Sequence, residues 1–451
     1  MDSKVLSSDY PSYPPQRSAS LADTELAQKH GPTSQHEQPA GPQKKWYRDT
    51  KAIVARMKSN WLLLFIIPAL IAPRYEQYIN SLLIFLFNLL AIIPLARIMT
   101  IGLDDIITRL GPEYAAVLHA LAGNLVELII SSFALMDGHY AVVRSALLGA
   151  ILSNILLVMG IIFLAGSMPK KGNPVRVLHA DLNSELFVST SASVLVLAFL
   201  ALVAPATFKI AAPAGTNLEC DLRNISRGTA VILLMLFAGL LTFQLKTHSK
   251  EIVDMTEFDH RESRYNVIFD LFLILVSVGC ITLCARYLVT SIEHTAEAYR
   301  LGSSFVGMVL LPICVMSNAI EHYEAIKHAS EEKINTAISL VLNASVQIAL
   351  LVTPILVLVG WVTQRPLTLD FTALEIAVLG CAVLIINYLV ADNKATWLEG
   401  LMLLASYIII AISFFYFPNP VDIDKDKDVF CNAFSRNLPP AGEGVAAEGG
   451  H

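Results

Sequence analysis

Charged residues are scarce in this 451-residue sequence. Asp, Glu, Lys and Arg together make up 16% of it, whereas hydrophobic residues make up 55%. Soluble globular proteins carry charge on about a quarter of their residues. Here the few charges gather between long apolar runs instead of lining one side of amphipathic helices. The composition therefore excludes a soluble globular protein and indicates an integral membrane protein.

Three other features are missing. The 32 Lys and Arg residues are outnumbered by 38 Asp and Glu residues and form no basic stripe, which excludes nucleic acid as a partner. None of the six cysteines has the spacing of a metal site. The sequence also lacks His-Glu-x-x-His, which argues against a zinc hydrolase built on Glu321, His322 and His328. We expect no enzyme activity and no bound cofactor.

The apolar runs predict eleven transmembrane helices, because a spanning helix needs about 20 mostly apolar residues. The predicted spans are Trp61–Ala72, Ser81–Met99, Tyr114–Met136, Ala141–Ala165, Leu186–Ala206, Thr229–Phe243, Val267–Val289, Phe305–Ile326, Ile334–Val362, Phe371–Ala391 and Thr396–Phe417. Lys and Arg are enriched on the segments that are cytosolic if the N-terminus is cytosolic. With an odd number of spans, the C-terminus is then lumenal. Asp270 and Arg286 lie near the ends of the seventh span, where we expect them to reach the interface.

Polar segments divide the chain. Residues 1–58 are expected to form a disordered cytosolic tail without a signal peptide, and residues 418–451 a disordered lumenal tail. Residues 59–245 hold the first helix and a first repeat, residues 246–265 a cytosolic linker, and residues 266–417 a second repeat.

An internal repeat is visible in three polar positions. Asn124-x-x-Glu127 recurs as Asn318-x-x-Glu321, displaced by 194 residues (318 − 124 and 321 − 127), and Gln347 follows Ser153 at the same offset. The two motifs lie five helices apart, so the second helix crosses the membrane in the opposite direction. We therefore predict an all-α protein of one N-terminal helix and two inverted five-helix repeats, an architecture common among secondary transporters.

The carboxylate of Glu127 is the main chemical clue. A charged side chain inside a membrane helix costs about 2.5–3.5 kcal/mol, and the span of Glu127 contains no Lys or Arg. Asn124 precedes Glu127 by one helical turn, so an amide oxygen and a carboxylate are expected to converge on one helix face. Such hard oxygen ligands suit calcium, magnesium or manganese better than zinc. Gly123 would let a neighbouring backbone approach.

The second motif doubles this site. Two glutamates offer two negative charges to one divalent ion, and without the ion a desolvated carboxyl group favours its protonated form. We predict that Asn124, Glu127, Asn318 and Glu321 bind the metal ion and that Glu127, Glu321 and His322 handle protons. Polar or small residues expected around them are Gly123, Ser153, Ser345 and Gln347. Structural roles, as interhelical hydrogen bonds or packing, remain open for each.

With these residues in view, the chain resembles the vacuolar cation/proton exchangers of the calcium/cation antiporter superfamily. Gly123-Asn-Leu-Val-Glu-Leu-Ile-Ile is similar to the first signature repeat of that family, and Ser317-Asn-Ala-Ile-Glu-His to the second. Further similar stretches are Phe85–Ala96, Phe243–His248, Val352–Trp361 and Trp397–Gly400. The resemblance implies calcium binding by the two repeat glutamates and uptake into an acidic vacuole in exchange for protons.

The sequence departs from that family at three places. Ser317 stands where the family has Gly, Asn343-Ala344 where it has Gly-Ser, and Ala150 where it has Ser. These changes add bulk or remove a hydroxyl near the site. A manganese-selective or monovalent-selective exchanger and a transport-incompetent membrane scaffold therefore remain as alternatives, and the oligomeric state is open.

Overall fold

The structure is a computed structural model, and every described residue belongs to one compact unit that begins at Ile53. The described residues are 60–75, 77–110, 118, 120–168, 178–179, 185–213, 218–247, 266–299, 301–314, 319–391 and 394–417. The two predicted tails and almost all of the predicted linker lie outside these ranges.

The described part of the chain is helical apart from one short pair of strands. The first half contains η1 (Asn60–Phe65), α3 (Ile66–Ile71), η2 (Ala72–Tyr75), α4 (Ser81–Ile107), α6 (Leu125–Met136), α7 (Tyr140–Leu152), η3 (Ser153–Val158), α8 (Met159–Ser167), β1 (Leu178–His179), α9 (Glu185–Ala211), α10 (Leu218–Thr242) and η5 (Phe243–Thr247). The second half contains α12 (Val267–Tyr299), α13 (Ser303–Phe305), η6 (Val306–Leu310), α14 (Leu311–Cys314), α15 (Ala319–Ser330), α16 (Ile334–Gln347), η8 (Ile348–Val352), α17 (Thr353–Val362), α18 (Ala373–Ala391), β2 (Lys394–Ala395) and α19 (Trp397–Phe415).

Eight helices among the described residues are long and apolar enough to cross a membrane. Two shorter apolar helices, Trp61–Tyr75 and Leu125–Met136, and the broken helix α13–α15 complete the predicted set of eleven. Several real helices exceed the predicted spans: α4 continues to Ile107, α10 begins at Leu218 and α12 continues to Tyr299. Hydropathy underestimates the length of these helices because their ends carry polar residues that reach the interface.

The predicted repeat is confirmed in the backbone. Helices α6 and α15 both have 12 residues, and both of their ends are displaced by 194 positions. Helices α7 and α16 begin at Tyr140 and Ile334, again 194 apart, after caps of similar conformation: φ −83°, ψ 54° at His139 and φ −91°, ψ 61° at Lys333. Each continues into a π-helical segment, η3 or η8.

Contacts between helix ends confirm that the repeats are inverted. At one membrane face, here named the first face, the end of α4 meets the beginning of α12 through Arg109 and Asp270, and β1 pairs with β2. At the opposite, second face, Arg144 at the beginning of α7 and Lys209 near the end of α9 both bind Asp370, just before α18. These contacts agree only if successive crossings alternate in direction. Helix α6 then runs towards the second face and α15 towards the first.

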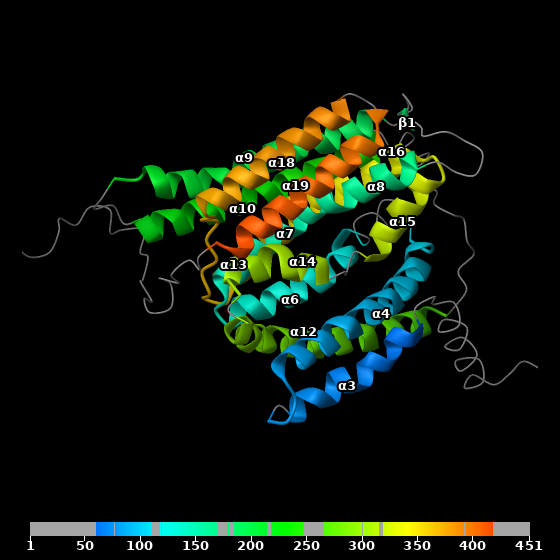
Figure 1. Cartoon of the computed structure of the whole chain (residues 1–451), viewed down its shortest axis with the longest axis vertical. Coiled ribbons are helices and arrows are strands. Elements are labelled where there is room, and N and C mark those ends of the chain that lie inside the picture. The colour runs from blue at the N-terminus through cyan, green and yellow to red at the C-terminus, as the bar shows by residue number, and fades with distance from the viewer. Residues whose placement is uncertain are drawn as a thin grey trace, which may run out of the picture. The chain divides into compact units, whose positions relative to one another are not determined.

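The helices pack in pairs drawn from both halves. Helix α4 lies along α12, α9 along α18, and α8 along α19. In Figure 1, α4 and α12 lie side by side beside α3, whereas α9, α10, α18 and α19 lie together on the other side of α6, α7 and α14. The short helix α6, which begins beside the first motif, therefore lies between two groups of long helices.

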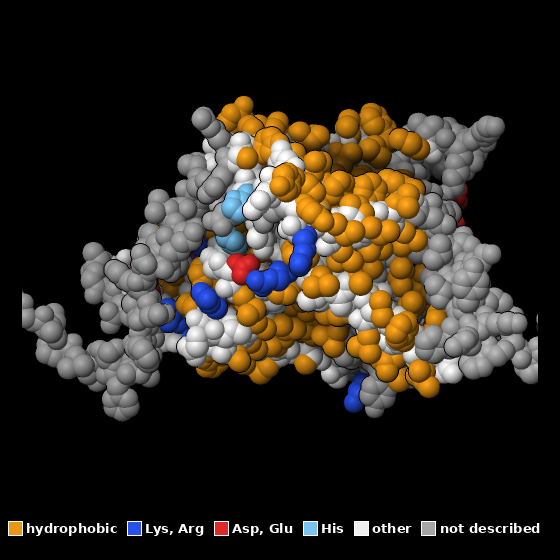
Figure 2. Space-filling model, turned by 90° about the horizontal axis from the view of Figure 1, so that it is seen from below, with side chains coloured by type: hydrophobic (Ala, Val, Ile, Leu, Met, Phe, Trp, Pro, Cys, Tyr) orange, Lys and Arg blue, Asp and Glu red, His pale blue; other side chains and the backbone are white. Residues whose placement is uncertain are grey.

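The outer surface is hydrophobic, as a lipid-facing surface must be. Figure 2 shows hydrophobic side chains over most of the described surface on the side seen there, with most of the charged and His side chains gathered in one part. On α12, for example, Leu271, Phe272 and Leu275 are about half exposed or more. Exposing such an extensive apolar surface to water is unfavourable, so the surface indicates contact with lipid.

The first motif-bearing span is interrupted at its motif, and the second is described only on either side of its motif. In the first, the helix is interrupted at Asn124, whose backbone is non-helical (φ −97°, ψ 6°), and α6 begins at Leu125. In the second, α13, η6 and α14 end at Cys314, and α15 begins at Ala319 after residues outside the described ranges. The predicted span Tyr114–Met136 does not anticipate the interruption at Asn124, because hydropathy cannot register a break within an apolar run. Such breaks are tolerated at membrane depth where the backbone is enclosed by protein.

Candidate ion-binding site

Glu127 lies in the first turn of the half-helix α6, with its side chain partly buried. The first N–H groups of a helix have no partner within the helix and give its beginning a partial positive charge. Asn124 occupies the cap position but its side chain does not bond to the first turn. The Glu127 carboxyl group therefore lies at the positive end of the α6 dipole.

Asn124 connects the two repeats. Its side chain is 2% exposed, and its Nδ2 donates to Ala120 O at 2.9 Å and to Gln347 Oε1 at 2.8 Å. Gln347 is the last residue of α16, in the second repeat. Asn124 Oδ1 accepts no hydrogen bond within the described part of the chain, so it can act as a ligand. Asn124 lies at the interruption before α6, and its convergence with Glu127 on one helix face stays a prediction. Gln347 holds the amide.

The second motif is described only in part. Glu321 is the third residue of α15, as Glu127 is the third residue of α6. Asn318 and Ser317 lie outside the described residues, and the placement of the Glu321 side chain is not described. The structure therefore pairs the two glutamates by backbone position, and their convergence stays a prediction.

His322 forms a second contact between the repeats. Its Nε2 lies 3.0 Å from Asn154 Oδ1, a hydrogen bond in which the imidazole N–H donates. Asn154 is the second residue of the π-helical segment η3 and is 2% exposed. Its Nδ2 has no partner among the described residues. A His–Asn contact between helices far apart in sequence gives no periodic signal, so sequence analysis alone does not reveal this pair.

The other predicted neighbours are placed but differ in their contacts. Gly123 immediately precedes the break at Asn124. Ser153 Oγ donates to Ala150 O at 3.3 Å, and Ser345 Oγ donates to Val341 O at 3.0 Å. Both hydroxyls thus bond to their own helices, a common arrangement for Ser in membrane helices. Of these neighbours, only Gln347 contacts a motif residue within the described part of the chain.

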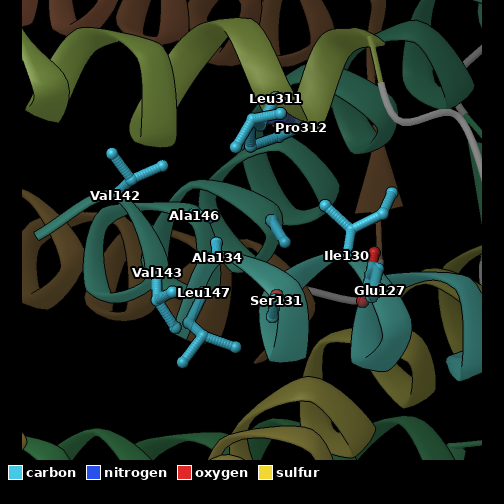
Figure 3. A pocket seen from close by; sticks show the side chains of 11 residues that line it. Glu127, Ile130, Ser131, Ala134, Val142, Val143, Ala146, Leu147, Leu311 and Pro312 are labelled. Carbon is cyan, nitrogen blue, oxygen red and sulfur yellow. The ribbon is translucent and has the colours of Figure 1, made fainter. Parts of the chain in front are cut away.

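A cavity extends from Glu127 between the halves of the protein (Figure 3). It offers about 40 Å³ to the centres of water-sized molecules, enough for more than one water. Its walls come from α6, α7 and α14: Glu127, Ile130, Ser131, Ala134, Val142, Val143, Ala146, Leu147, Ala150, Leu311 and Pro312. The lining runs along α6 from Glu127 to Ala134 and so towards the second face. Among the described residues that line it, Glu127 and Ser131 carry the only polar side chains.

The cavity walls depend on close backbone contacts. A Cβ atom added at Gly307 of η6 would lie 2.6 Å from Val142 O, and one at Gly149 would collide with the Met308 backbone. Both glycines thus allow η6 to lie directly on α7. Asn343 holds the repeat-equivalent position of Gly149 and is partly exposed. The two repeats are therefore unequal beside the site.

No group of three or more His, Cys, Asp and Glu side chains suited to a metal ion occurs within the described ranges. The donors described at the first motif are one carboxylate, one amide oxygen and one hydroxyl. These are all hard oxygen donors, which suit calcium, magnesium and manganese.

The fold and the broken, inverted helices define a multi-pass membrane transporter and not an enzyme. The family model "Sodium/calcium exchanger protein" matches residues 80–246 and 269–416, and the chain belongs to this family. It is 37% identical over 372 residues to the vacuolar calcium ion transporter of Schizosaccharomyces pombe, covering 82% of this chain and 87% of the relative. It is 34% identical over 371 residues to the Ca²⁺/H⁺ antiporter of Aphanothece halophytica, covering 79% and 96%.

A solved structure supports the same fold. The crystal structure of the selenium-substituted Ca²⁺/H⁺ antiporter protein YfkE matches with a TM-score of 0.62 and 26% identity, covering 82% of this chain and 100% of that chain. The resemblance to vacuolar cation/proton exchangers expected from the motifs is confirmed.

Proposed function

We propose that this protein is a proton-coupled calcium antiporter that moves calcium into an acidic vacuole. Two observations support the proposal: the pair of glutamates at equivalent positions of inverted half-helices, and relatives described as Ca²⁺/H⁺ antiporters and vacuolar calcium transporters. The N-terminus and the first face are cytosolic in this proposal, as the distribution of Lys and Arg favours.

The ligands act through charge balance. Glu127 and Glu321 together carry two negative charges when ionised, which are neutralised either by one divalent cation or by two protons. Asn124 Oδ1 adds a neutral oxygen ligand, and Gln347 orients the amide through its hydrogen bond to Nδ2. His322, held by Asn154, would transfer protons to or from Glu321. Binding of either cargo thus excludes the other.

The proton gradient supplies the energy. One pH unit is worth about 1.4 kcal/mol per proton, so two protons crossing a gradient of about two units supply about 5.5 kcal/mol. That free energy supports a cation gradient of roughly 10⁴-fold. Since two protons balance one divalent ion, this exchange at the two glutamates moves no net charge.

Access to the site alternates between the two faces. The cavity that runs from Glu127 along α6 towards the second face provides the lumenal route. Inverted repeats offer an equivalent route on the other side when the short helices change their packing against the long ones. In the proposed orientation, the cavity thus lies on the lumenal side of Glu127.

The proposal is tested by transport into liposomes with an acidic interior. The wild type should take up calcium, and uptake should stop when the pH gradient is dissipated. Glu127→Gln and Glu321→Gln should each abolish uptake, because a neutral amide at either position removes half of the balancing charge. Glu324→Gln, on an exposed position of α15, is the matched control and should retain uptake. Calcium uptake that survives in both glutamate variants would contradict the mechanism.

Manganese is the alternative cargo. Ala150 lines the cavity without a ligand atom, which leaves few protein oxygens near Glu127. Calcium takes six to eight oxygen ligands, whereas six oxygens suit manganese. Competition assays with manganese, sodium and potassium distinguish these cargoes. If no cation moves, the protein is a membrane scaffold instead.

A further inference from the structure

Cys220, the third residue of α10, forms a disulfide bond. The chain has six cysteines, and the free thiols among the described residues are those of Cys280, Cys284 and Cys381. Within the chain, the partner of Cys220 is therefore either Cys314 or Cys431. Neither of these side chains is described, so the choice between them depends on where the helices place each residue.

Cys220 lies on the outer side of the second face. The Ser226 hydroxyl, six residues further along α10, accepts a hydrogen bond from the backbone N–H of Leu369 at 3.0 Å. Leu369 directly precedes Asp370, whose ion pairs with Arg144 and Lys209 mark the second face. Helix α10 begins at this face and runs away from it. At 1.5 Å per residue, Cys220 thus lies about 9 Å further out than Ser226 along the helix axis.

Cys314 lies too deep to be the partner. It is the last residue of α14 and follows Ser303, where the broken helix begins near the second face, by 11 positions. Leu311 and Pro312, just before it, line the cavity that leads towards Glu127. Helix α14 packs mainly on η6 and α7, whereas α10 packs mainly on α9, α17 and η8. A disulfide requires Cα atoms about 4.4–6.8 Å apart, so a thiol at this depth cannot reach Cys220.

We propose that the partner of Cys220 is Cys431, in the C-terminal segment after α19. Helix α19 begins next to β2, at the first face, and therefore ends at the second face, where α10 begins. Cys431 follows Phe417, the last described residue, by 14 positions. A chain of that length spans up to about 50 Å, several times the distance of about 10 Å between packed helices. The bond joins the last helix of the first repeat to the segment that follows the second repeat.

The chemistry of this bond defines the compartment at the second face. Each of the two thiols loses a proton, and together they give up two electrons as the sulfur–sulfur bond forms. Thiol–disulfide exchange passes these electrons to an oxidised dithiol oxidoreductase, whose own disulfide is reduced. Such disulfides form and persist in the lumen of the secretory pathway and are rare in the cytosol. The second face is therefore lumenal, as the distribution of Lys and Arg independently favours.

The proposal does not depend on transport, so it is tested on the purified full-length protein without an uptake assay. Free thiols are blocked with N-ethylmaleimide in denaturant, and the protein is digested without reduction. We expect mass spectrometry to find peptides containing Cys220 and Cys431 joined by a bond that a reductant cleaves. A Cys220 peptide joined to Cys314, or Cys220 and Cys431 both carrying the maleimide, would overturn the proposal.

Counting thiols with a maleimide tests the same pairing through variants. The denatured parent protein should react at four cysteines, six minus the bonded pair, and at all six after reduction. C220S and C431S each leave five cysteines, and all five should react without a reductant. C381S, which removes an exposed free thiol, is the matched control and should react at three cysteines before reduction and five after. The same increase of two in C431S would show that Cys220 has another partner and would overturn the proposal.

Discussion

The hydrogen bond between Asn124 and Gln347 gives the sharpest prediction about the site. Asn124 Nδ2 donates to Gln347 Oε1 at 2.8 Å, which leaves Asn124 Oδ1 free to bind the ion. Gln347→Ala removes this orientation but no ligand. Hydrogen bonds between membrane helices contribute about 0.6 kcal/mol on average and up to about 1.7 kcal/mol. We therefore expect the half-saturating calcium concentration to rise roughly 3- to 18-fold.

A double-mutant cycle tests whether Gln347 acts through Asn124. Asn124→Ala should weaken calcium binding, and adding Gln347→Ala should have no further effect, since no amide remains to be oriented. The assay is the calcium dependence of uptake in liposomes for the wild type, both single variants and the double variant. Ser339→Ala is the control, because the Ser339 hydroxyl bonds only to its own helix, α16, at a position far from the break. Effects that add to within about 0.4 kcal/mol would refute the positioning role of Gln347.

Three further predictions concern the cavity and its supports. Ser131→Ala should raise the half-saturating calcium concentration about 3-fold without changing stability, because the Ser131 hydroxyl lines the cavity beside Glu127. Gly307→Ala should destabilise the protein by about 1–3 kcal/mol in thermal or denaturant unfolding, because the added Cβ meets Val142 O at 2.6 Å. Asp370→Asn should destabilise it by about 2 kcal/mol, because it breaks the 2.6 Å ion pair with Arg144. That value lies below the 3–5 kcal/mol of a fully buried pair because solvent screens part of the network.

Each of these predictions has a result that contradicts it. Unchanged calcium affinity in Ser131→Ala would show that the cavity is not on the ion's route. Gly307→Ala with wild-type stability would mean that η6 and α7 can separate freely. Asp370→Asn lies at the second face, away from the motifs, and should leave the calcium dependence of uptake unchanged. A change in the calcium dependence of uptake in this variant would indicate that the ion-pair network affects the ion-binding site.

The sequence predicts much of the fold because membrane insertion imposes strong rules. Apolar runs of the required length give the spans, and the displacement of Asn124 and Glu127 by 194 residues gives the repeat that the backbone of α6 and α15 reproduces. The helix breaks are not predictable in this way. Leu125 and its neighbours are as apolar as those of a continuous helix, and only tertiary packing decides where the backbone hydrogen bonds stop.

The sequence also does not predict which residues the polar side chains contact. Gln347 was expected near the site, but its contact with Asn124 depends on how the two repeats meet. Asn154 and His322 are 168 residues apart in sequence, and no local pattern connects them. Asp270 was misjudged because its position near the end of a span suggested exposure, whereas α4 extends beyond the predicted span and covers it.

The equal lengths of α6 and α15 have an electrical consequence. Glu127 and Glu321 each lie nine residues from the end of a 12-residue half-helix, and the two half-helices end at opposite faces. At 1.5 Å per residue, each glutamate position lies about 14 Å from its face. In a hydrocarbon core of about 30 Å, both therefore lie within a few ångströms of the same depth. An ion that passes between the two carboxylates crosses almost none of the membrane potential, so only the steps between the site and each face should depend on voltage.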